Sequence, residues 1–131
     1  MTILLLEDEG VVTRLLRFIL QARGYAILEA TSARQALEVC LVSNNECDLI
    51  ITDINLPMTS GIEVALQLRA RMPRLKIILT SGLPVGYHTD QHSALFSELP
   101  SDSVEFLQKP FIPADVLRMV DSLMGLGPNV S

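Results

Sequence analysis

The stretch that decides the fold is Ile3-Leu4-Leu5-Leu6-Glu7-Asp8-Glu9, an apolar run that ends abruptly in acidic residues. A short, continuous apolar run is typical of a β-strand covered on both faces, as in a parallel sheet. In open parallel sheets, the carboxyl ends of the strands form the edge at which ligands bind. The stretch therefore predicts a buried first strand that delivers Glu7 and Asp8 to such an edge.

Strand and helix patterns alternate along the rest of the chain. Short apolar runs predict strands over residues 25–29, 48–52, 75–80 and 104–108. Apolar spacing and end signals predict helices over 11–22, from a Thr31-Ser32 cap to about Ser43, over 62–71, and over 113–124. This alternation predicts an α/β fold, a doubly wound five-stranded parallel sheet with helices on both faces. Residues 82–103 are irregular, and we expect a short helix and the greatest mobility there.

Composition limits the class of protein. The chain has 131 residues, of which 49% are hydrophobic. This length and composition predict one domain over residues 1–124, followed by a flexible tail over 125–131. A net charge of −5 argues against nucleic-acid binding. No apolar run approaches the roughly 18 residues of a membrane span, so we expect a cytoplasmic protein that binds no membrane. Cys40 and Cys47 lack a metal-binding spacing, which favours buried thiols in a reducing compartment.

Reactive side chains follow three further strands. Asp53 follows the third strand, Ser81 the fourth and Lys109 the fifth. A carboxylate that attacks a phosphoryl group forms an aspartyl phosphate, which makes Asp53 the predicted nucleophile. Glu7, Asp8 and Asp53 offer the hard oxygen ligands that suit Mg²⁺. Lys109 supplies an opposing positive charge, and the Ser81 hydroxyl is able to donate a hydrogen bond to a phosphoryl oxygen.

These residues lie in four segments that together resemble the receiver domain of response regulators in two-component signalling, over essentially the whole chain. The segments are Leu4-Leu5-Leu6-Glu7-Asp8-Glu9, Asp53-Ile54-Asn55-Leu56-Pro57-Met58-Thr59-Ser60-Gly61, Ile77-Ile78-Leu79-Thr80-Ser81-Gly82 and Phe106-Leu107-Gln108-Lys109-Pro110-Phe111. The resemblance implies a flavodoxin-like, CheY-like fold with strand order 2-1-3-4-5. It also implies a phosphoacceptor domain, to which a histidine kinase or histidine phosphotransfer protein donates the phosphoryl group. Phosphorylation then switches partner binding, and the domain is expected to be a monomer or a phosphorylation-dependent dimer.

The resemblance implies a role for each site residue. Asp53 accepts the phosphoryl group, and Asp8, Asp53 and the backbone carbonyl of Asn55 bind Mg²⁺, with Glu7 acting mainly through metal-bound water. Ser81 and Lys109 contact the phosphoryl group. Phe106 takes the aromatic switch position, and the Lys109-Pro110 peptide bond is expected to be cis. Such a domain is a self-phosphorylating switch with slow autodephosphorylation, and is not a metabolic enzyme.

Some positions depart from the usual receiver pattern. Glu7 stands where Asp is more usual, and residues 82–103 are longer than usual, which affects the face that such domains use for signalling. Thr80 offers a second hydroxyl beside Ser81, and Phe106 also suits an ordinary core position. Two other functions stay open: a phosphorylation-independent interaction module on a receiver scaffold, and a haloacid-dehalogenase-type phosphohydrolase. The second needs an acid two residues after the nucleophile, where this chain has Asn55.

Overall fold

The computed structural model describes residues 1–42, 46–56, 59–82 and 103–125. Its elements are, in chain order, β1 (Thr2–Leu6), α1 (Gly10–Ala22), β2 (Ala26–Ala30), α2 (Ala33–Leu37), the π-helical turn η1 (Glu38–Val42), β3 (Leu49–Asp53), α3 (Gly61–Arg71), β4 (Lys76–Ser81), β5 (Val104–Gln108) and α5 (Pro113–Leu123). The strands form one parallel sheet in the order β2-β1-β3-β4-β5. The predicted fold class and strand order are confirmed.

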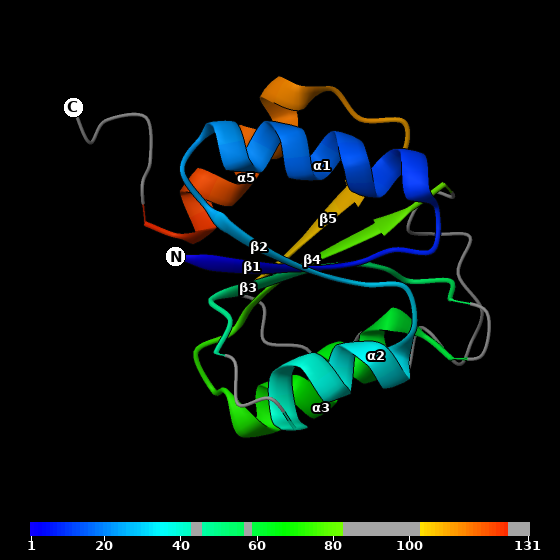
Figure 1. Cartoon of the computed structure of the whole chain (residues 1–131). Coiled ribbons are helices and arrows are strands. Elements are labelled where there is room, and N and C mark those ends of the chain that lie inside the picture. Colours follow the sequence, from blue (N-terminus) through cyan, green and yellow to red (C-terminus); the bar gives the residue numbers. More distant parts are fainter. Residues whose placement is uncertain (43–45, 57–58, 83–102, 126–131) are drawn as a thin grey trace.

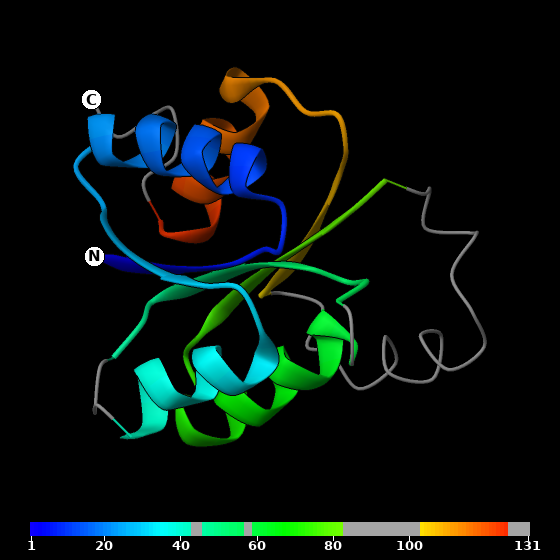
Figure 2. The same cartoon turned by 45° about the vertical axis from the view of Figure 1, so that its right-hand side comes forward.

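The sheet lies between two helical layers. Helices α1 and α5 cover one face, and α2 and α3 cover the other (Figures 1 and 2). Because successive side chains of a strand point to opposite faces, Leu4 joins the apolar cluster under α2 and α3, whereas Leu5 joins the cluster under α1 and α5. Residues Ile3 to Leu6 are fully buried. The continuous apolar run that opened the sequence is therefore the central, doubly covered part of the core.

Helix ends follow the sequence signals closely. The Ser32 side chain accepts a hydrogen bond from the Gln35 amide and caps α2, and Pro113 opens α5. Gly24, with a φ of 98°, follows the end of α1 in the left-handed conformation that glycine adopts most readily. The predicted strands over 25–29, 48–52 and 75–80 are each shifted by one residue toward the carboxyl terminus in the structure, so Asp53 is the last residue of β3.

The helix predicted from the Thr31-Ser32 cap to about Ser43 is not a single α-helix in the structure. The chain is α-helical only to Leu37 and then continues as η1. A π-helical turn winds more residues per turn than an α-helix, and in this turn Cys40 is buried in the cluster under α2 and α3. The apolar spacing does not separate the two kinds of helix over five residues. The sequence pattern therefore predicts a helix here without predicting its type.

Two expectations fall mainly on residues outside the described ranges. They are the short helix and high mobility expected within residues 82–103, and the flexible tail expected over residues 125–131. Within the described residues, no helix combines the length and apolar character that a membrane crossing requires.

Candidate functional site

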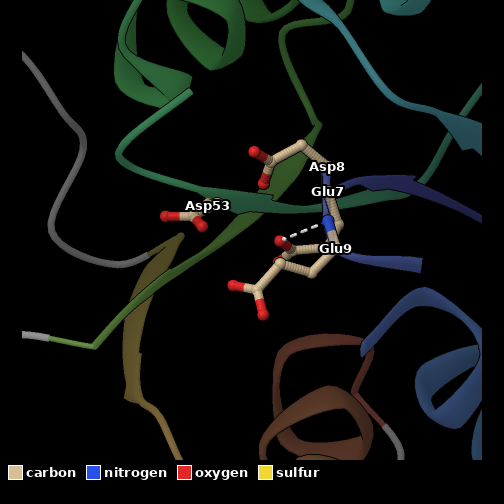
Figure 3. A group of neighbouring side chains, drawn as sticks. All are labelled: Glu7, Asp8, Glu9 and Asp53. Atoms are coloured by element: carbon tan, nitrogen blue, oxygen red, sulfur yellow. Dashed lines mark hydrogen bonds between the residues drawn. The ribbon is translucent and has the colours of Figure 1, made fainter. Parts of the chain in front are cut away.

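Acidic side chains from two strand ends converge at the carboxyl edge of the sheet. Leu6 pairs with Thr52 in the parallel register of β1 and β3, so the residues that follow them, Glu7 and Asp53, emerge side by side. One carboxylate oxygen from each of Glu7, Asp8, Glu9 and Asp53 lies within 4.8 Å of the others (Figure 3). The structure thus brings together the predicted acids, and adds Glu9 to them.

Lys109 enters this acidic group from the end of β5. Its Nζ lies 3.0 Å from Glu7 Oε2, 3.1 Å from Asp53 Oδ2 and 3.4 Å from Glu9 Oε1. Burial by itself would lower the pKa of the Lys109 ammonium, but hydrogen bonds and charges from Glu7 and Asp53 outweigh it and raise that pKa above its ordinary value. Lys109 is therefore held as a cation among the carboxylates.

Glu7 is the most deeply buried acid of the group. Its burial raises the pKa of the carboxyl, and the hydrogen bond and charge of Lys109 oppose that rise. The Glu9 amide also donates a hydrogen bond to Glu7 Oε1, at 3.2 Å (Figure 3). The Glu7 side chain is thus fixed between a backbone donor and the ammonium, although it is one methylene longer than Asp.

Asp53 is oriented through both of its carboxylate oxygens. Oδ1 accepts a hydrogen bond from the Asn55 amide at 2.9 Å, and Oδ2 accepts one from Lys109 Nζ at 3.1 Å. The residue is buried. Because these two donors fix the orientation of the carboxylate, a reacting group meets Asp53 in one defined geometry.

Ser81 ends β4 at the same edge of the sheet. Asp53 pairs with Thr80 in the register, and the Ser81 carbonyl accepts a hydrogen bond from the Lys109 amide at 2.7 Å. The Thr80 hydroxyl donates to the Thr52 carbonyl, at 3.5 Å, within the sheet. Of the two neighbouring hydroxyl residues, Thr80 is engaged by the sheet and Ser81 lies one step nearer the edge.

The two remaining predicted residues lie on β5 and just after it. Phe106 is half-buried and packs against the apolar cluster under α2 and α3. The Lys109-Pro110 peptide bond is cis.

The donor set of this site fits a hard divalent cation. The converging ligand atoms are carboxylate oxygens, which Mg²⁺ prefers. Asp8 is exposed, and no hydrogen bond or ion pair engages its carboxylate among the residues that the structure describes. Asp8 at the surface and Asp53 below it therefore offer oxygens to a cation, while Glu7 is the more deeply buried acid.

An apolar surface borders the site, and sequence reasoning missed it. A pocket of about 470 Å³ lies between Glu9 and Lys109 on one side and Val12, Leu15 and Phe111 on the other. Leu15 belongs to an exposed stripe on α1 that also contains Val11 and Phe18, which are 71% and 76% exposed. The signal was available, because these three residues recur at helical spacing beside the buried positions of α1.

Comparison with known proteins gives the family. The response regulator receiver domain family matches residues 3–121. The sensor kinase CckA of Brucella abortus (strain 2308) is 37% identical over 111 residues, which are 84% of this chain and 11% of CckA. The transcriptional regulatory protein ResD of Bacillus subtilis (strain 168) is 32% identical over 122 residues, which are 93% of this chain and 47% of ResD. The chain thus spans about half or less of the length of these curated relatives.

Solved structures agree with this result. The response regulator TrrA of Thermotoga maritima, in complex with Mg²⁺-BeF, has 31% identity and a TM-score of 0.73, covering 93% of this chain and 97% of TrrA. The chemotaxis protein CheY4 of Vibrio cholerae shares the fold at 21% identity and a TM-score of 0.77, covering 93% of this chain and 97% of CheY4. With its sheet order, its acidic edge and a family match over most of its length, this chain belongs to the response regulator receiver domains of two-component signalling.

Proposed function

We propose that this receiver domain takes a phosphoryl group from a histidine kinase or histidine phosphotransfer protein onto Asp53, with Mg²⁺ as cofactor, and thereby switches partner binding. The observation that carries the proposal is the setting of Asp53. Its two oxygens are held by Asn55 and Lys109, and three further carboxylates lie within reach of a shared cation. Three acids around Lys109 already exceed what an ordinary ion pair needs, and the fourth, Asp8, converges on the same point without an ion pair to any residue that the structure describes.

Each residue of the site has a separate task in this transfer. The Asp53 carboxylate attacks phosphorus as the bond from phosphorus to the donor's histidine nitrogen breaks, and the electron pair of that bond stays on the nitrogen. Glu7, Asp8, Asp53 and the Asn55 carbonyl would hold Mg²⁺, whose charge reduces the repulsion between the two anions. Lys109 neutralises Asp53 beforehand and then follows the charge onto the phosphoryl oxygens.

Two further residues connect the phosphoryl group with the rest of the domain. The Ser81 hydroxyl donates a hydrogen bond to a phosphoryl oxygen, which draws the end of β4 toward Asp53. Phe106, half-buried on the neighbouring strand β5, then repacks into the space this movement leaves. Phosphorylation adds up to about two negative charges, enough to bias a two-state equilibrium at the surface.

The exposed stripe of Val11, Leu15 and Phe18 is the proposed docking surface for the kinase. It adjoins the pocket that opens beside Lys109, so a partner seated on α1 would reach Asp53 directly. TrrA, which shares 31% identity with this chain, has been solved in complex with the histidine kinase ThkA. The alternative of a phosphohydrolase is not favoured, because such an enzyme needs an acid two residues after the nucleophile. Asn55 takes that position, and its backbone amide donates a hydrogen bond to Asp53.

Intact mass after incubation with acetyl phosphate, with and without Mg²⁺, tests the proposal. We expect a single Mg²⁺-dependent phosphoryl adduct in the wild type and none in Asp53→Asn. Asp48→Asn is the matched control, because Asp48 flanks the other end of β3 and an Asn there retains an oxygen for the Thr2 amide. Equal adduct in Asp53→Asn would place the phosphate elsewhere. No wild-type adduct from acetyl phosphate or from phosphorylated kinases would favour the phosphorylation-independent module.

A further inference from the structure

The two cysteines are in contact, in a part of the molecule that the proposed function does not use. Cys40 is the central residue of η1, and Cys47 lies two residues before β3. Their Sγ atoms are 3.3 Å apart, and both residues carry free thiols. They lie near the amino-terminal end of β3, whereas Asp53 ends that strand. Whatever these thiols do is therefore separate from the phosphoacceptor site.

The thiols are well placed to bond to each other. A disulfide has a sulfur–sulfur distance of about 2.05 Å, so an approach of roughly 1.3 Å from the observed contact would form one. Both residues belong to the apolar cluster under α2 and α3, with exposures of 4% and 7%. A disulfide would replace two weakly polar S–H groups with an apolar link, in keeping with those surroundings.

One of the two thiols can be reached from outside. Cys47 lines an open pocket of about 360 Å³, together with Glu46, Arg71 and Met72. The pocket lies at the amino-terminal ends of β3 and β4, and is large enough for a small neutral oxidant. Cys40 lies directly behind Cys47, in a π-helical turn, a geometry that is uncommon and is often found at functional sites.

We propose that Cys40 and Cys47 form a modification site, a dithiol that hydrogen peroxide converts reversibly into an intramolecular disulfide. The Cys47 thiolate attacks one peroxide oxygen, the O–O bond breaks, and a sulfenic acid and water result. The Cys40 sulfur then attacks the sulfenic sulfur, forming the S–S bond, and a second water leaves. Two thiols lose two electrons and two protons, and one peroxide becomes two waters.

Burial gives this reaction a characteristic pH dependence. It raises the pKa of both thiols, although the hydrogen bond from Cys47 partly offsets the rise at Cys40. Because the thiolate is the nucleophile, oxidation should be slow at neutral pH and accelerate as the pH increases. The disulfide would fix η1 to the start of β3 and leave Asp53 and its neighbours in place.

The test uses the full native chain, reduced and desalted, then exposed to hydrogen peroxide at pH 7 and pH 9. Residual thiols are alkylated under denaturing conditions and counted by intact mass, and peptide mapping identifies any cross-link. We expect the loss of two hydrogens, a Cys40–Cys47 cross-linked peptide, faster conversion at pH 9, and recovery of both thiols with dithiothreitol. Cys40→Ser and Cys47→Ser should form no intramolecular link, and the wild-type map stands if either variant fails to fold.

Three results would overturn the proposal. One is full alkylation of both thiols at peroxide doses that completely oxidise glutathione, which would show inert core cysteines. Another is overoxidation of one cysteine without a cross-link. The third is a cross-link that forms in urea but not in the folded chain, because the native contact would then play no part. None of these readouts involves phosphorylation, so failure here leaves the proposed function untouched.

Discussion

At the scale of single residues, a glycine sets how closely two parts of the site approach. Gly61 opens α3, and a Cβ built on it would lie 1.9 Å from the Asp53 carbonyl oxygen and 2.5 Å from Thr52 Oγ1. The Gly61 amide donates to the Ile54 carbonyl at 2.9 Å. Helix α3 thus begins directly against the backbone of Asp53, the proposed phosphoacceptor, and only a residue without a side chain permits this contact.

Gly61→Ala should therefore destabilise the domain. We expect the free energy of unfolding to fall by about 2–3 kcal/mol, because a backbone carbonyl cannot yield as a flexible side chain does. Gly10→Ala is the matched control at the start of α1, where a Cβ meets no atom within 4 Å. Its stability should stay level or rise slightly, since alanine favours helix. Urea unfolding followed by circular dichroism measures both, and equal losses in the two variants would contradict this account.

The sequence predicts which residues meet at the site better than how they touch. Glu7, Asp8, Asp53 and Lys109 each follow a strand, and parallel strands end at one edge, so their convergence follows from topology alone. The contact between Glu9 and Lys109 depends on a side-chain conformation, and the approach of Gly61 to Asp53 depends on how α3 packs. The pattern of apolar residues in the sequence predicts neither of these two contacts.

At the scale of elements, α1 presents apolar residues on two faces. Leu16, Ile19 and Leu20 are buried against the sheet, while Phe18 is 76% exposed on the stripe beside the site. An exposed phenylalanine adds nothing to the core, so its place on α1 suits contact with a partner.

Phe18→Ala should impair phosphotransfer from a kinase and spare the chemistry. We expect affinity for the kinase to fall roughly 5- to 30-fold, or about 1–2 kcal/mol, as for truncation of an aromatic anchor at an interface. The rate with acetyl phosphate should not change, because Phe18 does not contact the site. The kinase is the one that transfers fastest in a panel of purified, autophosphorylated histidine kinases. Gln21→Ala, exposed on the same helix, is the control, and unchanged transfer to Phe18→Ala would move docking to another surface.

Element boundaries show where sequence patterns lose resolution. Capping residues such as Ser32 and Pro113 act locally, and the helices begin where these signals place them. The sequence analysis did not predict the π-helical turn η1, in which Cys40 contacts Cys47, a residue seven positions further along the chain. A change in helix type over five residues does not alter the apolar spacing enough to be read.

At the scale of the whole molecule, a buried carboxylate on the last helix bonds to residues near the start of the chain. Asp121, on α5, accepts a hydrogen bond from the Tyr25 hydroxyl at 2.8 Å and forms an ion pair with Arg23. Tyr25 and Asp121 are 96 residues apart in the chain, and both are buried. No local pattern predicts a contact of this range. It links the turn between α1 and β2 to the last helix, away from the acidic edge of the sheet.

Tyr25→Phe should lower the free energy of unfolding by about 1–2 kcal/mol at pH 8, because Asp121 loses one of its two donors. It should also change the response to alkali. Burial, followed by the hydrogen bond and charge of Asp121, raises the pKa of Tyr25 from its ordinary 10 to about 12. Between these values the folded chain keeps a proton that the unfolded chain releases, so stability is complete below pH 10 and declines as the pH rises toward 12.

The difference between wild type and Tyr25→Phe across that window isolates this contribution. It should shrink from pH 9 to pH 11 by about 1 kcal/mol, measured by urea unfolding at each pH. Arg118→Ala is the matched control on α5, since its ion pair with Asp115 is exposed and should contribute under about 0.5 kcal/mol at any pH. A constant difference across the window would mean that the Tyr25 hydroxyl is neither buried nor held by Asp121 in solution. The joining of α5 to the turn after α1 would then rest on the ion pair with Arg23 and on apolar packing.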